Sequence, residues 1–309
     1  MKKLAFALAA AVGLVACGDK PATPAASPAP TATDQPDTTT APRSAETAFA
    51  DTLDSALAGS WRSDANKARD AWRHPKETLA YFGVAPGHSV LEITPGGGWY
   101  TEILAPALKG NGNYVAAIAG PDTSDYAKRN AERFRAKLAE DGERYGEVKV
   151  VEFDPKAPDF AVDGAVDVVL TFRNVHNWLD ENHSTPMFAA FFKALKPGGV
   201  LGVVEHRAAA GADLAAIKGS GYLPTELVIK LATDAGFELA GQSEINANPN
   251  DTKDYEKGVW TLPPVLTLGD QDREKYLAIG ESDRMTLKFV KPQGDAIFKQ
   301  GTDKGPSTQ

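Results

Sequence analysis

The chain has 309 residues, of which 42% are hydrophobic and 24% are charged. This length and composition are sufficient for one sizeable hydrophobic core, so one large folded domain is expected. The formal net charge of -8 argues against a dominant nucleic-acid-binding surface, because such surfaces carry an excess of Lys and Arg.

The N-terminus has the layout of a signal peptide: two lysines, an apolar or small-residue stretch from Leu4 to Ala16, and then Cys17, the only cysteine. As a helix the apolar stretch would span roughly 20 Å, short of the roughly 30 Å hydrocarbon core of a bilayer. The four residues LVAC that end at Cys17 resemble the lipobox of bacterial lipoproteins. The resemblance implies removal of residues 1–16, lipidation of Cys17 and anchoring in the cell envelope facing the periplasm. The alternative is an ordinary secretory signal with an incidental cysteine.

Residues 17–45 consist almost entirely of Ala, Pro, Thr, Ser and Asp. They offer nothing for a core and are expected to form a disordered tether. The folded domain is expected over residues 46–298, followed by a disordered tail over residues 299–309. With a single cysteine in the chain, no intramolecular disulfide can stabilise the fold.

The folded part opens with a helical pattern over residues 46–82. Ser63 is suited to cap one helix, Pro75 to occupy the first turn of another, and Gly83 to follow its end. Four polar residues in this preface could form a lid over a cleft, although a solvated helix face is the favoured interpretation: Arg69, Asp70, Arg73 and His74.

Short apolar runs rich in β-branched residues then alternate with amphipathic stretches. This alternation predicts a Rossmann-like three-layer α/β sandwich with a mostly parallel seven-stranded sheet. The predicted strands are residues 89–94, 114–119, 148–153, 166–172, 199–206, 237–244 and 284–292.

The first predicted strand runs into a glycine-rich turn in LEITPGGGWYTEIL. Such a turn between strand and helix lets a nucleotide-like ligand approach the backbone, and the helix start offers unpaired N–H groups. A nicotinamide cofactor is a competing interpretation, but the chain lacks GxGxxG because Thr101 stands at the third glycine position. Glu92 lies in the strand and could contact a ligand or merely cap the next helix.

Four segments carry a family resemblance: RHPKETLAYFGV, PGGGWYTEIL, FRNVHNW and LKPGGVLGVVEHR. Through them the chain resembles the class I S-adenosylmethionine-dependent methyltransferases, and more closely a group of secreted, lipoprotein-type methyltransferase-like proteins, over about residues 51–292. The resemblance implies S-adenosylmethionine as the cofactor, with Asp154 near the adenine and Asn174 and His176 beside the transferred methyl group. The cofactor contacts it implies are Glu92, Thr94, Pro95, Gly96, Gly97, Gly98, Tyr100, Thr101, Asp154 and Asn174.

The chain departs from the family pattern at two places. Thr94, followed by Pro95, stands where the family has the first glycine of its loop. Ile118 and Ala119 stand where the family has an acidic residue that holds the ribose hydroxyls. Asp122, a few residues later, could reach the ribose from a longer loop.

His176 is the first candidate for a general base, because histidine titrates near neutrality; a loop histidine bonded to nearby backbone is the alternative. Glu205 and His206, at the end of the fifth strand, are the second candidates. Neighbours on a strand point to opposite faces, so at most one of this pair is expected to face the site. Trp99 is expected to pack in the core and Tyr100 to line the pocket. The histidines show no ligand spacing to cysteine, so no metal site is predicted.

The predicted function is methylation of an unknown small molecule or envelope component at the cell envelope, with a lipid anchor as the membrane contact. The alternative is a non-catalytic methyltransferase-like lipoprotein that binds a ligand or partner in the periplasm. The reason for considering this alternative is that a polar, charged cofactor made in the cytoplasm does not cross a bilayer unaided. Loss of cofactor binding predicts a filled cleft, whereas the retained glycine turn predicts an open one.

Overall fold

The structure is a computed structural model that describes residues 45–294. The predicted signal peptide, Cys17, all of the tether before residue 45, and the tail over residues 299–309 lie outside the described residues. Among the described helices, none combines the length and the apolar character that crossing a membrane requires.

A helical preface precedes the sheet, as the sequence predicts. It consists of α1 (Ala45–Ala58), α2 (Asp64–Lys67), α3 (Asp70–Arg73) and α4 (Pro75–Phe82). The Ser63 side chain accepts a hydrogen bond from the Asn66 backbone N–H and caps α2. Pro75 occupies the first turn of α4, where a missing N–H costs nothing. Gly83 ends α4 with a φ of 76°, a conformation that favours glycine.

The sheet has seven strands in the order β3-β2-β1-β4-β5-β7-β6. All pairings among β1 to β5 are parallel, and β7 runs antiparallel to both of its neighbours. The predicted Rossmann-like, mostly parallel sheet is confirmed. The strands are β1 (Ser89–Ile93), β2 (Asn113–Ala119), β3 (Lys149–Phe153), β4 (Val166–Phe172), β5 (Leu195–His206), β6 (Glu238–Ser243) and β7 (Arg284–Val290).

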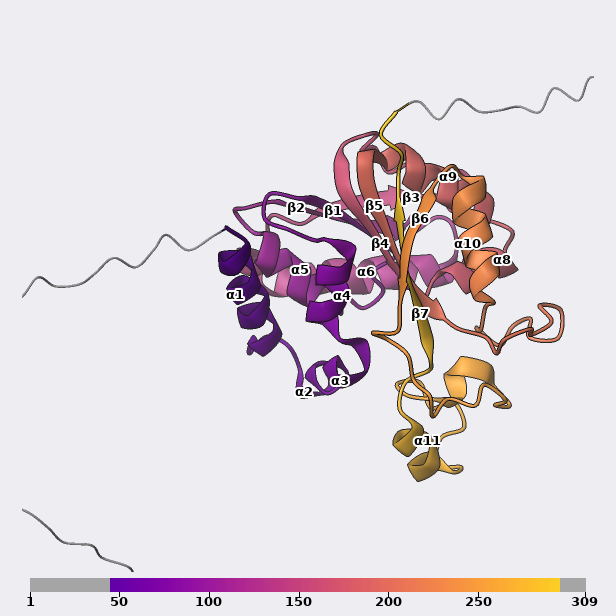
Figure 1. Cartoon of the computed structure of the whole chain (residues 1–309). Coiled ribbons are helices and arrows are strands. Elements are labelled where there is room, and N and C mark those ends of the chain that lie inside the picture. Colours follow the sequence, from indigo (N-terminus) through magenta and orange to yellow (C-terminus); the bar gives the residue numbers. More distant parts are fainter. Residues whose placement is uncertain (1–44, 295–309) are drawn as a thin grey trace, which may run out of the picture. The chain divides into compact units, whose positions relative to one another are not determined.

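Helices cover both faces of the sheet (Figure 1). On one face, strand residues such as Val90 and Val168 pack against α1, α4, α5 and α6. On the other face, residues such as Leu91 and Val169 pack against α8, α9 and α10. Successive residues of buried strands thus supply both cores, which explains why the strands read as continuous apolar runs. The helices after β1 are α5 (Thr101–Leu108), α6 (Asp125–Glu140), α7 (Gly142–Tyr145), α8 (Val175–Asp180), α9 (Ser184–Ala194) and α10 (Thr225–Asp234).

Strand order reverses between β1 and β4, since the chain proceeds outward from β1 through β2 and β3 before returning to β4. In open α/β sheets, ligands bind beyond the carboxyl ends of the strands at this reversal. The connection from β6 to β7 leaves and re-enters the sheet at the same edge, because β7 is antiparallel. It contains the short 3₁₀ helix η1 (Gly258–Thr261) and α11 (Arg273–Ile279).

Candidate functional site

A cleft of about 600 Å³ opens at the carboxyl ends of β1 and β4, within the range of roughly 300–1,000 Å³ usual for small-molecule sites. Its walls come from the glycine turn after β1, the loop after β4, and the end of β5. Helices α3 and α6 and two segments of the β6–β7 connection, residues 259–265 and 281–282, complete it. Segments far apart in the sequence therefore converge at the reversal of strand order.

The glycine turn presents an open backbone face to this cleft. Gly96 has a φ of 59°, and a Cβ added to Gly96 or Gly97 would meet no atom within 4 Å. Gly98 has another use: a Cβ there would lie 2.9 Å from Cδ of Lys137 on α6, so glycine permits close packing against that helix. Pro95, Gly96 and Gly97 line the cleft, whereas Gly98 faces α6.

Thr94 adopts a positive φ of 52°, the left-handed conformation that glycine adopts without strain. The backbone therefore keeps the shape of a glycine turn although the residue has changed. Its N–H donates to the Ala117 carbonyl oxygen at 2.8 Å. The Asn174 amide donates to the Ile93 carbonyl oxygen at 3.1 Å and connects the turn to the loop after β4.

Glu92 points from β1 into the cleft wall and is 3% exposed. The Tyr114 hydroxyl donates to its carboxylate at 2.5 Å and lies 2.8 Å from the Thr101 hydroxyl. Burial raises the pKa of Glu92 to about 7, an effect that the bond from Tyr114 and the charge of Arg173 reduce. Thr101 is fully buried behind the turn and does not line the cleft. Glu92 does not cap α5, whose first residue has no side-chain cap.

A second pocket, of about 410 Å³, lies at the carboxyl ends of β2 and β3 and is lined by Gly120, Asp122 and Asp154. β2 ends at Ala119 without an acidic side chain. Asp122 is exposed in the following loop and shares the pocket with Asp154. The carboxylates of Asp122 and Asp154 thus share one pocket, at the end of the strand next to β1.

His176 and Glu205 form a buried dyad. Nδ1 of His176 lies 3.0 Å from Oε1 of Glu205, and the side chains are 7% and 0% exposed. The carboxylate also accepts the backbone N–H groups of Val175, His176 and His206. A carboxylate only accepts hydrogen bonds, so this contact favours the His176 tautomer with the proton on Nδ1 and the lone pair on Nε2. His176 lines the cleft and Glu205 lies behind it.

His206 lines the cleft beside His176, with ring centroids 5.4 Å apart, and its Nδ1 lies 2.5 Å from the Ser282 hydroxyl. His176, Glu205 and His206 offer possible metal-ligating atoms within 4.8 Å of one another, a juxtaposition that sequence spacing does not reveal. Burial lowers the pKa of His206 well below its usual value, and the charges of His176, Arg173 and Arg284 lower it further.

The preface contributes charged side chains to the cleft. Arg69 and Arg73 both line it, and each donates through Nε to the Glu281 carboxylate. Interpretation of these two arginines as a solvated helix face is wrong, because α3 turns them toward a buried acid 208 or more residues away in sequence. Asp70 instead pairs with Arg62, and His74 joins α3 to α4 in a left-handed conformation.

Trp99 and Tyr100 both reach the cleft wall from largely buried positions. The indole N–H of Trp99 donates to the Asn66 carbonyl oxygen, and the Arg73 guanidinium lies 4.7 Å from the ring centroid. Tyr100 stacks on Phe172 with ring centroids 3.7 Å apart. Both rings hold the wall in place as well as lining it.

Several cleft residues were not identified from the sequence, among them Arg173, Trp260 and Glu281. Arg173 directly follows a buried strand, and that position was the one available signal. Trp260 on η1 packs edge-on against His176, with ring centroids 6.0 Å apart. No local pattern marks Trp260 or Glu281, because each reaches the cleft through the long β6–β7 connection.

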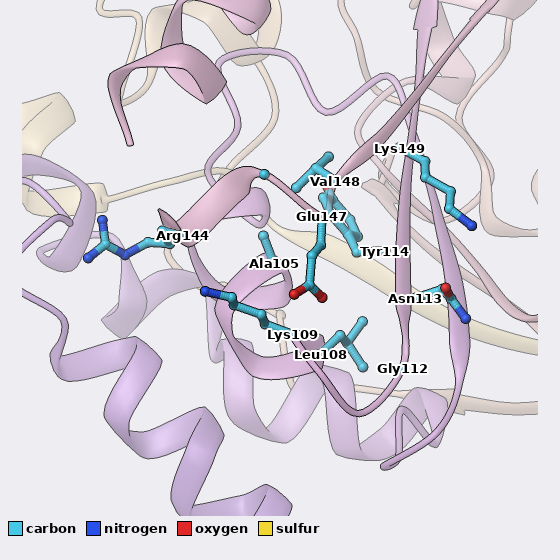
Figure 2. A pocket seen from close by; sticks show the side chains of 11 residues that line it. Ala105, Leu108, Lys109, Gly112, Asn113, Tyr114, Arg144, Glu147, Val148 and Lys149 are labelled. Carbon is cyan, nitrogen blue, oxygen red and sulfur yellow. The ribbon is translucent and has the colours of Figure 1, made fainter. Parts of the chain in front are cut away.

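Another pocket lies at the opposite edge of the sheet (Figure 2), where β2 and β3 begin. Two of its charged groups bond to nearby backbone: Lys109 donates to the Glu143 carbonyl oxygen, and Glu147 accepts the Gly110 N–H. Since ligands of this fold bind at the carboxyl ends of the strands, this pocket is not the candidate site.

Residues 91–203 match a family model described as a methyltransferase domain. The match spans β1 to most of β5 and includes the glycine turn, Asn174 and His176. It shows that this stretch, less than half of the chain, is similar to a methyltransferase domain. The match supports S-adenosylmethionine as the cofactor.

Solved structures share the fold at low sequence identity. The cyclase SpnF is 19% identical with a TM-score of 0.50, covering 80% of this chain and 93% of its own. A SAM-dependent methyltransferase from Aquifex aeolicus is 15% identical with a TM-score of 0.48, covering 72% and 93%. No curated protein matches the chain by sequence. Because a cyclase shares the fold, the reaction has to be argued from the site.

Proposed function

We propose that the protein is an S-adenosylmethionine-dependent methyltransferase of the cell envelope that acts on a small molecule or envelope component. The main supporting observation is that the open glycine turn faces the same cleft as His176, which Glu205 contacts from behind. The open cleft favours retained cofactor binding, because loss of cofactor binding is expected to leave the cleft filled.

The residues at the turn fit the cofactor. Gly96 and Gly97 leave their backbone face unobstructed, Glu92 offers a carboxyl group beside it, and Asp122 and Asp154 offer carboxylates for the nucleoside end. When bound, S-adenosylmethionine supplies a methyl group on a positively charged sulfur, which leaves as the neutral thioether after transfer. The chain supplies alignment of the acceptor and exclusion of water.

The dyad supplies the proton acceptor. As the acceptor's oxygen, nitrogen or carbon forms its bond to the methyl group, its proton passes to Nε2 of His176. Glu205 keeps the ring in the required tautomer and stabilises the imidazolium that forms. Trp260 of the β6–β7 connection packs against the same ring, and Val259 of that connection also lines the cleft. This connection is therefore placed to shape the acceptor pocket.

Cofactor binding is tested by calorimetric titration of the full chain with S-adenosylmethionine and S-adenosylhomocysteine. In Gly97→Ala the added Cβ projects into the open face of the turn without positive-φ strain. We expect it to keep its melting temperature and lose affinity by about tenfold or more. Gly142→Ala is the matched control, because Gly142 is also unobstructed and unstrained but lies on α7, away from the cleft. Absence of binding at millimolar cofactor by a folded protein contradicts the proposal.

The envelope location rests on the lipobox-like LVAC sequence, on the signal-peptide layout before it, and on the resemblance to secreted lipoprotein-type relatives. Lipidation of Cys17 supplies the membrane anchor in this proposal. We expect incorporation of labelled palmitate and recovery in the membrane fraction, both lost in Cys17→Ser. Wild-type protein that stays in the cytosol without label contradicts the location while leaving the enzymatic proposal intact.

A further inference from the structure

Arg173 is an arginine without a partner in the wall of the cleft, among the residues that the structure describes. It follows β4 directly and has a positive φ of 61°, a conformation that non-glycine residues seldom adopt without a reason. Its guanidinium lines the cleft and makes no hydrogen bond or ion pair with any residue from 45 to 294. Burial lowers the pKa of Arg173 to about 10, and the charge of Glu281 opposes part of this shift. The cation is thus partly removed from water, although no carboxylate bonds to it.

The neighbours of Arg173 do not supply that anion. Glu281 already accepts hydrogen bonds from Arg69, Arg73 and Arg284, so one carboxylate serves three guanidinium groups. The other cleft carboxyl group is Glu92, whose raised pKa leaves it partly uncharged at neutral pH. This side of the cleft therefore carries an excess of positive charge in a protein whose net charge is -8.

The excess charge lies on the acceptor side of the reversal point. Arg173 follows β4, Glu281 precedes β7 and Arg284 begins it. In the sheet, β4 and β7 lie on the opposite side of β1 from β3, which Asp154 follows. The charges of Arg173 and Arg284 both act on His206, which neighbours the dyad histidine. An anion bound at Arg173 would thus lie near the proposed base and away from the nucleoside end of the cofactor site.

We propose that Arg173, supported by Arg69 and Arg73, binds an anionic group of the methyl acceptor, so that the substrate is a small molecule bearing a carboxylate or phosphate. A guanidinium presents paired N–H donors that match the oxygens of either group. The proposal rests on the proposed function, because it assigns the acceptor to the same cleft. The methionine carboxylate of the cofactor is the other source of this chemistry, and the experiment separates the two.

The test is calorimetric titration of the full chain with benzoate and with inorganic phosphate, at constant ionic strength, with and without saturating S-adenosylhomocysteine. Benzyl alcohol is the uncharged control for benzoate. Arg173→Asn removes the cation while keeping a residue that tolerates positive φ. Arg133→Met is the matched control, because Arg133 also lines the cleft but comes from α6.

We expect at least one anion to bind the S-adenosylhomocysteine-loaded protein, and Arg173→Asn to weaken it by about tenfold or more. Arg133→Met should change the anion's affinity by less than about twofold, and benzyl alcohol should bind much more weakly than benzoate. If Arg173→Asn instead weakens S-adenosylhomocysteine and that ligand excludes the anions, Arg173 serves the cofactor and the inference is overturned. Binding of neither anion, or equal binding by Arg173→Asn, overturns it as well.

Failure of S-adenosylhomocysteine to bind would contradict the proposed function, whereas the titrations without it still test the anion site. Melting temperatures of both variants show whether a loss of binding reflects unfolding. Should Arg173→Asn fail to fold, Arg69→Gln provides a second test. Arg69 supports the bound anion in this proposal, and its side chain is partly exposed, so we expect this variant to fold. Anion affinity unchanged in a folded Arg69→Gln would then overturn the inference.

Discussion

Glu92 keeps its carboxyl group out of water, with a hydrogen bond from Tyr114 as its side-chain partner. Burial raises its pKa from the ordinary glutamate value of 4.5 to about 7 in the folded protein. Between these two values the folded protein binds more protons than the unfolded chain, so the free energy of unfolding falls as the pH rises. Above pH 7 this contribution is constant.

We expect the free energy of unfolding to decrease by up to about 3 kcal/mol between pH 4.5 and pH 7 through Glu92 alone. Urea unfolding at a series of pH values measures it. Glu92→Gln cannot titrate but can still accept the bond from Tyr114, so the variant should lack this component. A pH dependence identical in the two proteins would show that Glu92 does not cause it.

Thr94 is a β-branched residue held at a φ of 52°, which costs on the order of 1–2 kcal/mol relative to glycine. Thr94→Gly removes that strain but adds backbone freedom to the unfolded chain, which opposes part of the gain. We expect a net stabilisation of about 0.5–1 kcal/mol, measured by urea unfolding. Thr94→Ala keeps a Cβ and should show no such gain; equal stabilisation by both variants would exclude backbone strain as the cause.

Among the elements, α3 is joined to the start of β7 by charge. Glu281 is 4% exposed and pairs with Arg73 and Arg284, whose side chains are 4% and 2% exposed, and also with Arg69. Removal of one partner from a buried ion pair leaves uncompensated charge in a medium of low dielectric constant. The cluster therefore makes the position of the preface helix depend on a single carboxylate.

We expect Glu281→Gln to lower the free energy of unfolding by about 3 kcal/mol or more. Asp54→Asn is the control, because the ion pair of Asp54 with Lys76 is exposed and should contribute less than about 1 kcal/mol. Chemical denaturation of both variants at one salt concentration measures the difference. Losses of similar size would mean that the Glu281 cluster stabilises no more than a surface pair.

For the whole folded unit, the preface and the sheet share one core. Phe82 of α4 is fully buried with strand residues such as Val90 and Val168, and its ring lies against Gly202 of β5, where an added Cβ would be 2.6 Å from the ring. Glycine at this position allows α4 to contact the sheet directly. Helices and sheet are therefore expected to unfold together.

We expect Phe82→Ala to lower the free energy of unfolding by about 3–5 kcal/mol, with a single transition seen alike by far-ultraviolet circular dichroism and tryptophan fluorescence. The exposed Tyr126→Ala on α6 is the control and should change stability by less than about 0.5 kcal/mol. Two separated transitions in Phe82→Ala would show that the preface folds independently of the sheet.

Local patterns were sufficient for the secondary structure. The apolar runs at Val90 and Val168 lie on buried strands, and Pro75 and Gly83 bound a helix as their conformational preferences predict. The glycine turn was also visible, because strand, glycines and helix are adjacent in sequence. The interpretation of Arg69 and Arg73 as part of a solvated helix face was wrong. A charged helix face has the same sequence pattern whether it contacts water or a buried carboxylate.

The sequence by itself determined the fold class, the position of the glycine turn and the candidacy of His176, because each depends on residues close together in the chain. Only the tertiary structure decided that Glu205 orients His176, that Glu281 gathers three arginines, and that Arg173 is left without a partner among the described residues. The contact of Glu205 with His176 and those of Glu281 with Arg69 and Arg73 join residues about 30 to more than 200 positions apart. They exist because the sheet brings strand ends and the β6–β7 connection to one edge, and neither periodicity nor spacing encodes which side chains meet there.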